Sequence, residues 1–156
     1  MQLYHVTLQN LNETFMSHGK ICTAPSIGQA VVGLLDLKHP KREIENDGKL
    51  YIYSCTKPSK GTRKGKEFDQ KATGELIIYS PVVFTKVRTW SKEYTSHLDK
   101  MCSVLHELYS LISVEKYIVV ASIIAEAINN SIEDTDNFFT EVSKLSTTEN
   151  YDITEF

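Results

Sequence analysis

Three residues from two distant segments of this sequence have the chemistry of a polar site. Tyr4-His5-Val6-Thr7 lies in the opening segment, and Thr73-Gly74-Glu75 follows much later. If residues 2–8 form a strand, His5 and Thr7 project to the same side, because alternate side chains of a strand share a face. A carboxylate from a later strand would complete a polar cleft in an apolar sheet. Such a cleft is a reason to expect chemistry.

Each of these side chains also has a simpler interpretation. A histidine in a short apolar strand is often a core residue whose hydrogen bonds are satisfied within the protein. A glutamate at the start of a strand, such as Glu75 after Gly74, is often a solvated surface carboxylate. Both interpretations stay open at the level of sequence.

The length and composition are those of a soluble globular chain. Its 156 residues suit one domain, or one domain with a helical extension. Cys22, Cys55 and Cys102 show no paired spacing, so reduced thiols in a cytosolic protein are the simplest interpretation. No basic stretch leads into an apolar segment at the N-terminus, and the longest apolar stretch, 117–125, is too short to span a bilayer. We therefore expect no membrane partner and a cytoplasmic location.

The charge is unevenly distributed along the chain. The net charge is -3, so no global basic field attracts nucleic acid or membrane. Residues 57–66, however, hold five basic side chains and no acid, whereas 131–156 hold seven acids and one lysine. The basic residues are candidates for contact with nucleic acid or another partner: Lys57, Lys60, Arg63, Lys64 and Lys66.

The alternative for this basic segment is a solvated, mobile loop. It has no interleaved aromatic residue, so its sequence does not suggest base stacking. Its glycines do not form a phosphate-binding P-loop, because the spacing Gly-x4-Gly-Lys-Ser/Thr is absent.

The first ninety residues read as β-rich. Runs of β-favouring residues predict strands over 2–8, 21–24, 49–55, 75–79 and 82–90. Ser26 with Gln29 has the form of a capping box and predicts a helix over 26–37, although Gly28 and Gly33 weaken that prediction. Between the strands we expect turns in 10–19, with one short helical turn at most, and a loop over 56–67.

From residue 91 the apolar spacing becomes helical. A stripe runs from Tyr94 to Ile112, and 114–128 is apolar almost all round, so this second helix should be the most buried. A third helix begins near Ser131. Cys102 and His106 are spaced for a metal, but no second ligand pair accompanies them, so we predict no metal site.

The order of these elements predicts an α+β fold. It consists of a β-rich core over 1–90, a helical extension over 91–145 and an acidic, disordered tail over 146–156. The helices either cover the sheet or form a subdomain beside it. If the sheet does not cover their apolar faces, those faces become a surface for an oligomer or a partner.

The β-rich half resembles the ADP-ribosyltransferase-like fold. Tyr4-His5-Val6-Thr7 is similar to the His-x-Ser/Thr element of the first core strand. Residues 19–26, which run into Ala30, resemble the glycine-strand-serine-helix segment that follows. Thr73-Gly74-Glu75-Leu76 before Pro81 resembles the late acidic element. Small phage and prophage proteins of unknown role share the Tyr-His-Val and Thr-Gly-Glu pattern.

The resemblance implies a site that binds NAD as a substrate and breaks its nicotinamide-ribose bond. His5 would hydrogen-bond a ribose hydroxyl, Thr7 would support it, and Glu75 would be the catalytic carboxylate. Ser26 belongs to the segment that resembles the family's serine-helix element. The family's aromatic residues around nicotinamide are missing, and Tyr51 or Tyr53 would have to replace them from the next strand.

Three functions follow for testing. The first is an ADP-ribosyltransferase that acts on NAD, with a host protein, nucleic acid or water as acceptor. The second is a non-catalytic, phage-type inhibitor that binds a host protein or a nucleotide in the host cytoplasm. The third, ranked last because the net charge is negative, is a nucleic-acid binder that uses the basic segment.

Overall fold

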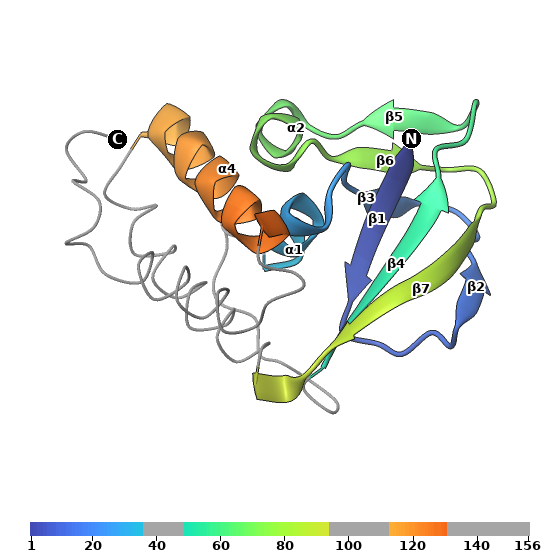
Figure 1. Cartoon of the computed structure of the whole chain (residues 1–156). Helices are drawn as coiled ribbons and strands as arrows, with labels where there is room; N and C mark the ends of the chain where they lie inside the picture. The colour runs from blue at the N-terminus through green and yellow to red at the C-terminus, as the bar shows by residue number, and fades with distance from the viewer. Residues whose placement is uncertain (36–48, 94–112, 131–156) are drawn as a thin grey trace.

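The computed structural model describes residues 1–35, 49–93 and 113–130. Two antiparallel sheets and three helices make up this part, so the predicted α+β class is confirmed (Figure 1). The larger sheet has the order β1 (Gln2–Thr7), β4 (Leu50–Thr56), β7 (Val83–Trp90), β2 (Thr14–Met16). The smaller sheet has the order β3 (Ile21–Thr23), β6 (Leu76–Ile78), β5 (Thr62–Lys64). The helices are α1 (Ile27–Leu35), α2 (Glu67–Thr73) and α4 (Val114–Asn130).

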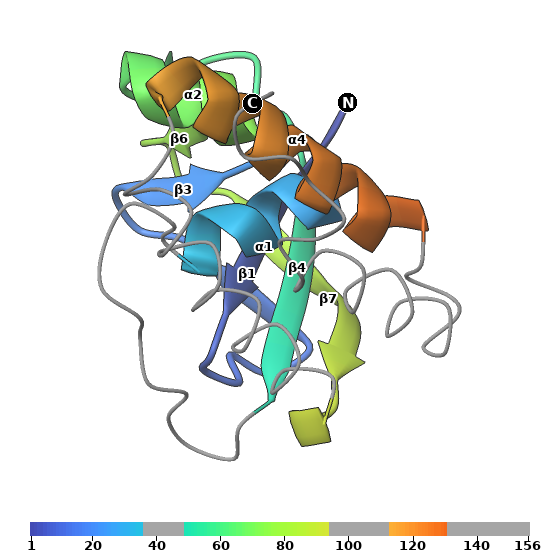
Figure 2. The same ribbon diagram turned by 90° about the vertical axis from the view of Figure 1, so that its left-hand side faces the viewer.

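The helices α1 and α4 lie against one face of the larger sheet (Figure 2). Val6 and Ile52 of the sheet share a buried core with Val31 of α1 and Ile124 of α4. The described part of the helical half therefore covers the sheet, which was one of the two arrangements that the sequence left open. Among the described helices, none has the length and apolar character needed to cross a membrane.

The buried residues of α4 lie on one side of the helix. The buried positions recur at intervals of three and one, as expected for a helix with one apolar face. They are Tyr117, Val120, Ala121, Ile124, Ala125 and Ile128. Val119 on the other side keeps 50% of its surface exposed. Among the described helices α4 buries the most apolar residues, as the sequence predicts, although only one of its faces meets the core.

A close crossing of α1 and α4 explains the glycine inside α1. A Cβ atom on Gly28 would meet the backbone carbonyl oxygen of Ala125. The Gly28 N–H also donates to Asn129 Oδ1 at 2.7 Å, so a side chain of α4 satisfies one free donor at the start of α1. Gly28 therefore fits this contact rather than marking a break in the helix.

A second core lies between the two sheets, and a bulge in β7 divides the side chains of that strand between both cores. Phe84 packs in this second core, whereas Trp90 packs on the helix side. Along a regular strand both even-numbered residues would share a face. The register shifts between Ile52 and Tyr53 of β4, so that Tyr53 faces Lys86 and Ile52 faces Arg88.

Three elements do not appear in the sequence analysis: β2, β5 and α2. The expected helical turn in 10–19 is replaced by β2, which pairs with β7 through Phe15 and Phe84. The expected loop over 56–67 contains β5, which pairs with β6. Each of these two strands is defined by its pairing with a neighbouring strand. The helices predicted over 94–112 and from Ser131, and the acidic tail, lie outside the described residues.

Candidate functional site

A cavity of about 430 Å³ opens where β1 meets β3 and the helices α1 and α2. This volume lies within the range of small-molecule sites, about 300–1,000 Å³. Polar and apolar side chains line it in similar measure. Its lining includes Tyr4, His5, Cys22, Gln29, Lys66, Asp69, Thr73 and Glu75.

The position of β1 at the edge of its sheet makes this cavity possible. Residues from both faces of the strand, Tyr4 and His5, line the cavity, and β1 is the edge strand of the larger sheet. Tyr4 and Ala24 exchange backbone hydrogen bonds of 2.9 and 3.0 Å, so the chain after β3 is held against β1. The two sheets therefore meet at the cavity.

The His5 imidazole has a defined orientation. Its Nδ1 lies 2.9 Å from the Cys22 carbonyl oxygen. Because a carbonyl only accepts, Nδ1 carries the proton, and Nε2 is the acceptor nitrogen of the neutral ring. Phe15 and Phe84 contact the ring edge to face, with centroids 6.5 and 6.1 Å away. Burial lowers the pKa of His5, and the hydrogen bond to Cys22 opposes this shift.

Two glycines place Glu75 beside the cavity. Gly74 ends α2 in a left-handed conformation, with φ of 66°, and this turns the chain toward β6. Gly65 donates its backbone N–H to the Glu75 carbonyl at 3.0 Å, and a Cβ atom on Gly65 would meet the Glu75 carboxylate. The Glu75 side chain therefore occupies space that only a glycine at position 65 leaves open.

The carboxylates of this region influence the pKa of the Cys22 thiol. Burial raises the pKa of Cys22, and the negative charge of Glu75 raises it further; Lys20 opposes this shift, and Asp69 adds the smallest contribution. The thiol is therefore held in its protonated form.

The structure brings His5 and Glu75 to this cavity, but not Thr7, Ser26, Tyr51 or Tyr53. The Thr7 hydroxyl accepts from the Gln9 backbone N–H at 3.1 Å. Ser26 accepts from the Gln29 N–H at 3.2 Å and from Asn129 at 3.1 Å, so it caps α1 as the capping box predicts. These contacts are structural.

The two tyrosines lie in the second core. Tyr51 is 5% exposed, and Tyr53 is completely buried. The Tyr53 hydroxyl accepts from the Leu11 N–H at 2.9 Å and donates to the Asn12 carbonyl at 2.8 Å. Their place in the interior follows from the register of β4, in which both pair with β1 on the face away from the helices. Neither therefore replaces the family's aromatic residues at the cavity.

Sequence reasoning missed several residues of the cavity. Tyr4 was passed over because strand alternation puts it on the face opposite to His5, and only an edge strand shows both faces. Asp69 and Thr73 belong to α2, a helix that the sequence analysis did not predict. Their spacing of four residues, which places them on one side of a helix, was the available signal.

The predicted basic residues separate into two groups. Lys57, Lys60, Arg63 and Lys64 are exposed on and around β5. Lys66 is exposed as well, and it also lines the cavity.

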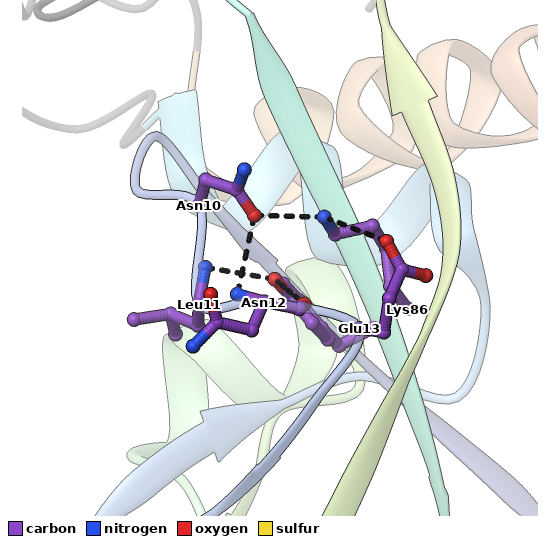
Figure 3. Close-up of polar contacts among 6 residues, drawn as sticks. Asn10, Leu11, Asn12, Glu13 and Lys86 are labelled. Atoms are coloured by element: carbon purple, nitrogen blue, oxygen red, sulfur yellow. Dashed lines mark hydrogen bonds and ion pairs between the residues drawn. The ribbon is translucent and has the colours of Figure 1, made fainter.

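A lysine lies on the same sheet face as His5, two strands away. His5 faces Tyr53, and Tyr53 faces Lys86, so the three form one row across β1, β4 and β7. Lys86 Nζ donates to Asn10 Oδ1 at 2.7 Å and lies 3.5 Å from Glu13 Oε1 (Figure 3). Its charge also lies over the rings of Tyr51 and Tyr53, at 5.1 and 5.9 Å from their centroids.

No protein-family model, curated protein or solved structure matches this chain. Within residues 1–35, 49–93 and 113–130, no group of three or more histidine, cysteine, aspartate or glutamate side chains is arranged to hold a metal ion. Cys102 and His106 lie outside the described residues.

Proposed function

We propose that the cavity binds NAD or a related nucleotide, and that the protein is ADP-ribosyltransferase-like and transfers ADP-ribose to a host target. One observation supports this most. His5 of β1 and Glu75 before β6, the two residues that the family resemblance pairs, line one cavity although seventy residues separate them. The polar residues Gln29, Asp69 and Thr73 of the same lining supply further hydrogen-bonding groups.

The chemistry assigns a role to each side chain. Breakage of the nicotinamide-ribose bond sends its electron pair to the leaving nicotinamide and builds positive charge on the ribose. The Glu75 carboxylate stabilises that charge and orients the acceptor, whose proton it takes as the new bond to the ribose forms. The neutral His5 ring accepts a hydrogen bond from a ribose hydroxyl through Nε2, because Nδ1 is held by Cys22. Tyr4 offers a ring against which nicotinamide can stack.

Two measurements on matched variants test this proposal. Nicotinamide release from NAD should fall by about 100-fold or more in Glu75→Gln, because a preorganised charge is lost. Calorimetry should show that His5→Ala weakens NAD binding by about 10-fold, the effect of one lost hydrogen bond.

The chain offers a control for each change. Glu67→Gln removes an exposed carboxylate of α2 outside the cavity, and His18→Ala removes an exposed histidine. Both should behave as the unchanged protein does. Release that persists at the same rate in Glu75→Gln, or a wild-type protein that does not bind NAD, would contradict the proposal.

A second candidate function is non-catalytic binding of a nucleotide or a host protein through the same fold. It is favoured by the small number of aromatic rings at the cavity: among its described lining residues, these are Tyr4 and His5. In that case NAD or ADP-ribose binds, no nicotinamide is released, and Glu75→Gln leaves binding intact. The two measurements above therefore separate the candidates.

A further inference from the structure

We propose that the surface around β5 binds single-stranded nucleic acid. This β5 surface consists of Lys57, Lys60, Arg63, Lys64, Lys66 and Tyr79. It lies at the free edge of the smaller sheet, on β5 and the adjoining end of β6, away from α4 (Figure 1). The proposal does not depend on NAD binding or turnover.

The charge of this surface is available to a partner. All five basic side chains are exposed, and within the described part of the chain no acid forms an ion pair with any of them. No acidic residue occurs among positions 57–66, although the chain as a whole has a net charge of -3. A local positive field on an acidic protein directs a polyanion to this one place.

The basic residues are held by defined backbone contacts, not by a mobile loop. Thr62 faces Ile78 and Lys64 faces Leu76 in the β5–β6 pair. The Tyr79 N–H donates to the Gly61 carbonyl at 2.7 Å, which extends the pairing past the strand end. Binding therefore costs little additional ordering of the backbone.

Tyr79 supplies the aromatic ring that the basic segment lacks. Tyr79 is 41% exposed, and the Arg63 guanidinium lies 5.3 Å from the centroid of its ring. The sequence argued against base stacking because residues 57–66 contain no aromatic residue, but the pairing of β5 with β6 brings one beside them. Exposed cations next to an exposed ring are the arrangement that binds single strands, since an unpaired base stacks while its phosphates meet the charges.

The β5 surface also reaches the cavity. Lys66 belongs to both, and Gly65 beside it bonds the backbone of Glu75. A single-stranded nucleic acid bound along β5 would therefore pass beside the cavity at Lys66. This continuity holds whether or not the cavity turns over NAD.

Fluorescence anisotropy with a labelled oligo(dT) of about 16 nucleotides tests the proposal, because single-strand sites span up to about that length. Five phosphate contacts would give a slope of about -3.5 for log binding constant against log salt, and each lost contact reduces it by about 0.7. The triple variant Lys60→Gln/Arg63→Gln/Lys64→Gln should therefore have a less steep salt dependence, with a slope of about -1.4 instead of about -3.5. Tyr79→Leu should weaken binding by about 10-fold, the loss of one stacked base, and leave the slope unchanged.

The control changes net charge by the same amount elsewhere. Lys20→Gln/Lys49→Gln/Lys92→Gln removes three exposed lysines outside the β5 surface and should retain binding. Circular dichroism checks that every variant is folded. Equal affinity for the matching duplex or for heparin would overturn the proposal, because neither offers an unpaired base. An absence of oligo(dT) binding, or equal losses in the two triple variants, would overturn it as well.

Discussion

His5 and Lys86 occupy the two ends of one row of side chains, yet the protein surrounds them differently. Both face the second core on either side of Tyr53. At the Lys86 end the chain closes on itself, since the loop after β1 brings Asn10 and Glu13 to the ammonium group (Figure 3). At the His5 end the sheet stops, and a cavity begins.

The difference separates an ionisable side chain with a structural role, Lys86, from one that is a candidate for function, His5. Lys86 is only 11% exposed, and its hydrogen bond and ring contacts all come from its own chain. His5 is fixed through one nitrogen by the Cys22 carbonyl, and it borders a space large enough for a ligand. A buried ionisable group is therefore a stronger functional candidate where an edge strand leaves one side of it open.

Removal of the Lys86 charge should have the largest effect on stability. We expect Lys86→Met to lower the free energy of unfolding by about 2–3 kcal/mol, because a charged hydrogen bond and cation–π contacts are lost. Urea denaturation measures this change, and Lys92→Met, at an exposed lysine, is the control. An unchanged urea midpoint would mean that the contacts of Lys86 with the loop after β1 do not stabilise the fold. NAD binding should persist in folded Lys86→Met, which sharpens the contrast with His5.

The His5 end should respond to pH. Burial lowers the pKa of His5 below its ordinary value of 6.5, so the unfolded chain takes up a proton at a higher pH than the folded protein does. The stability contributed by the neutral ring is therefore complete above about pH 6.5 and declines as the pH falls toward the lower folded value. Urea denaturation across this range should show that His5→Gln flattens the decline. The exposed control His18→Gln should retain it; an identical decline in His5→Gln would show that other groups cause it.

The Glu13 ion pair should have the smallest effect. Glu13 is 86% exposed and lies 3.5 Å from Lys86, so solvent screens the pair. We expect Glu13→Gln to change the free energy of unfolding by less than about 0.5 kcal/mol. A loss as large as that of Lys86→Met would indicate that the ion pair, and not the hydrogen bond to Asn10 and the tyrosine rings, holds the lysine.

The local pattern predicted most of the strands and the helix α1, but not β2, β5 or α2. Alternating residues gave β1, a run of β-favouring residues gave β4, and the capping box of Ser26 and Gln29 gave the start of α1. His5 and Glu75 line one cavity, whereas Thr7 and the two tyrosines lie elsewhere. Their exclusion depends on which sheet face borders the cavity, and alternation within a strand carries no information on that.

The sequence by itself determined the α+β class, the main strands and the uneven charge, because periodicity and composition are local properties of the chain. Only the tertiary structure decided what those residues meet. The bulge in β7 sends Phe84 and Trp90 to different cores, the edge position of β1 brings His5 and Tyr4 to one cavity, and the β5–β6 pair sets Tyr79 beside Arg63. Each of these depends on contacts between residues distant in sequence, and the strands that make them are stabilised by their partners more than by their own composition.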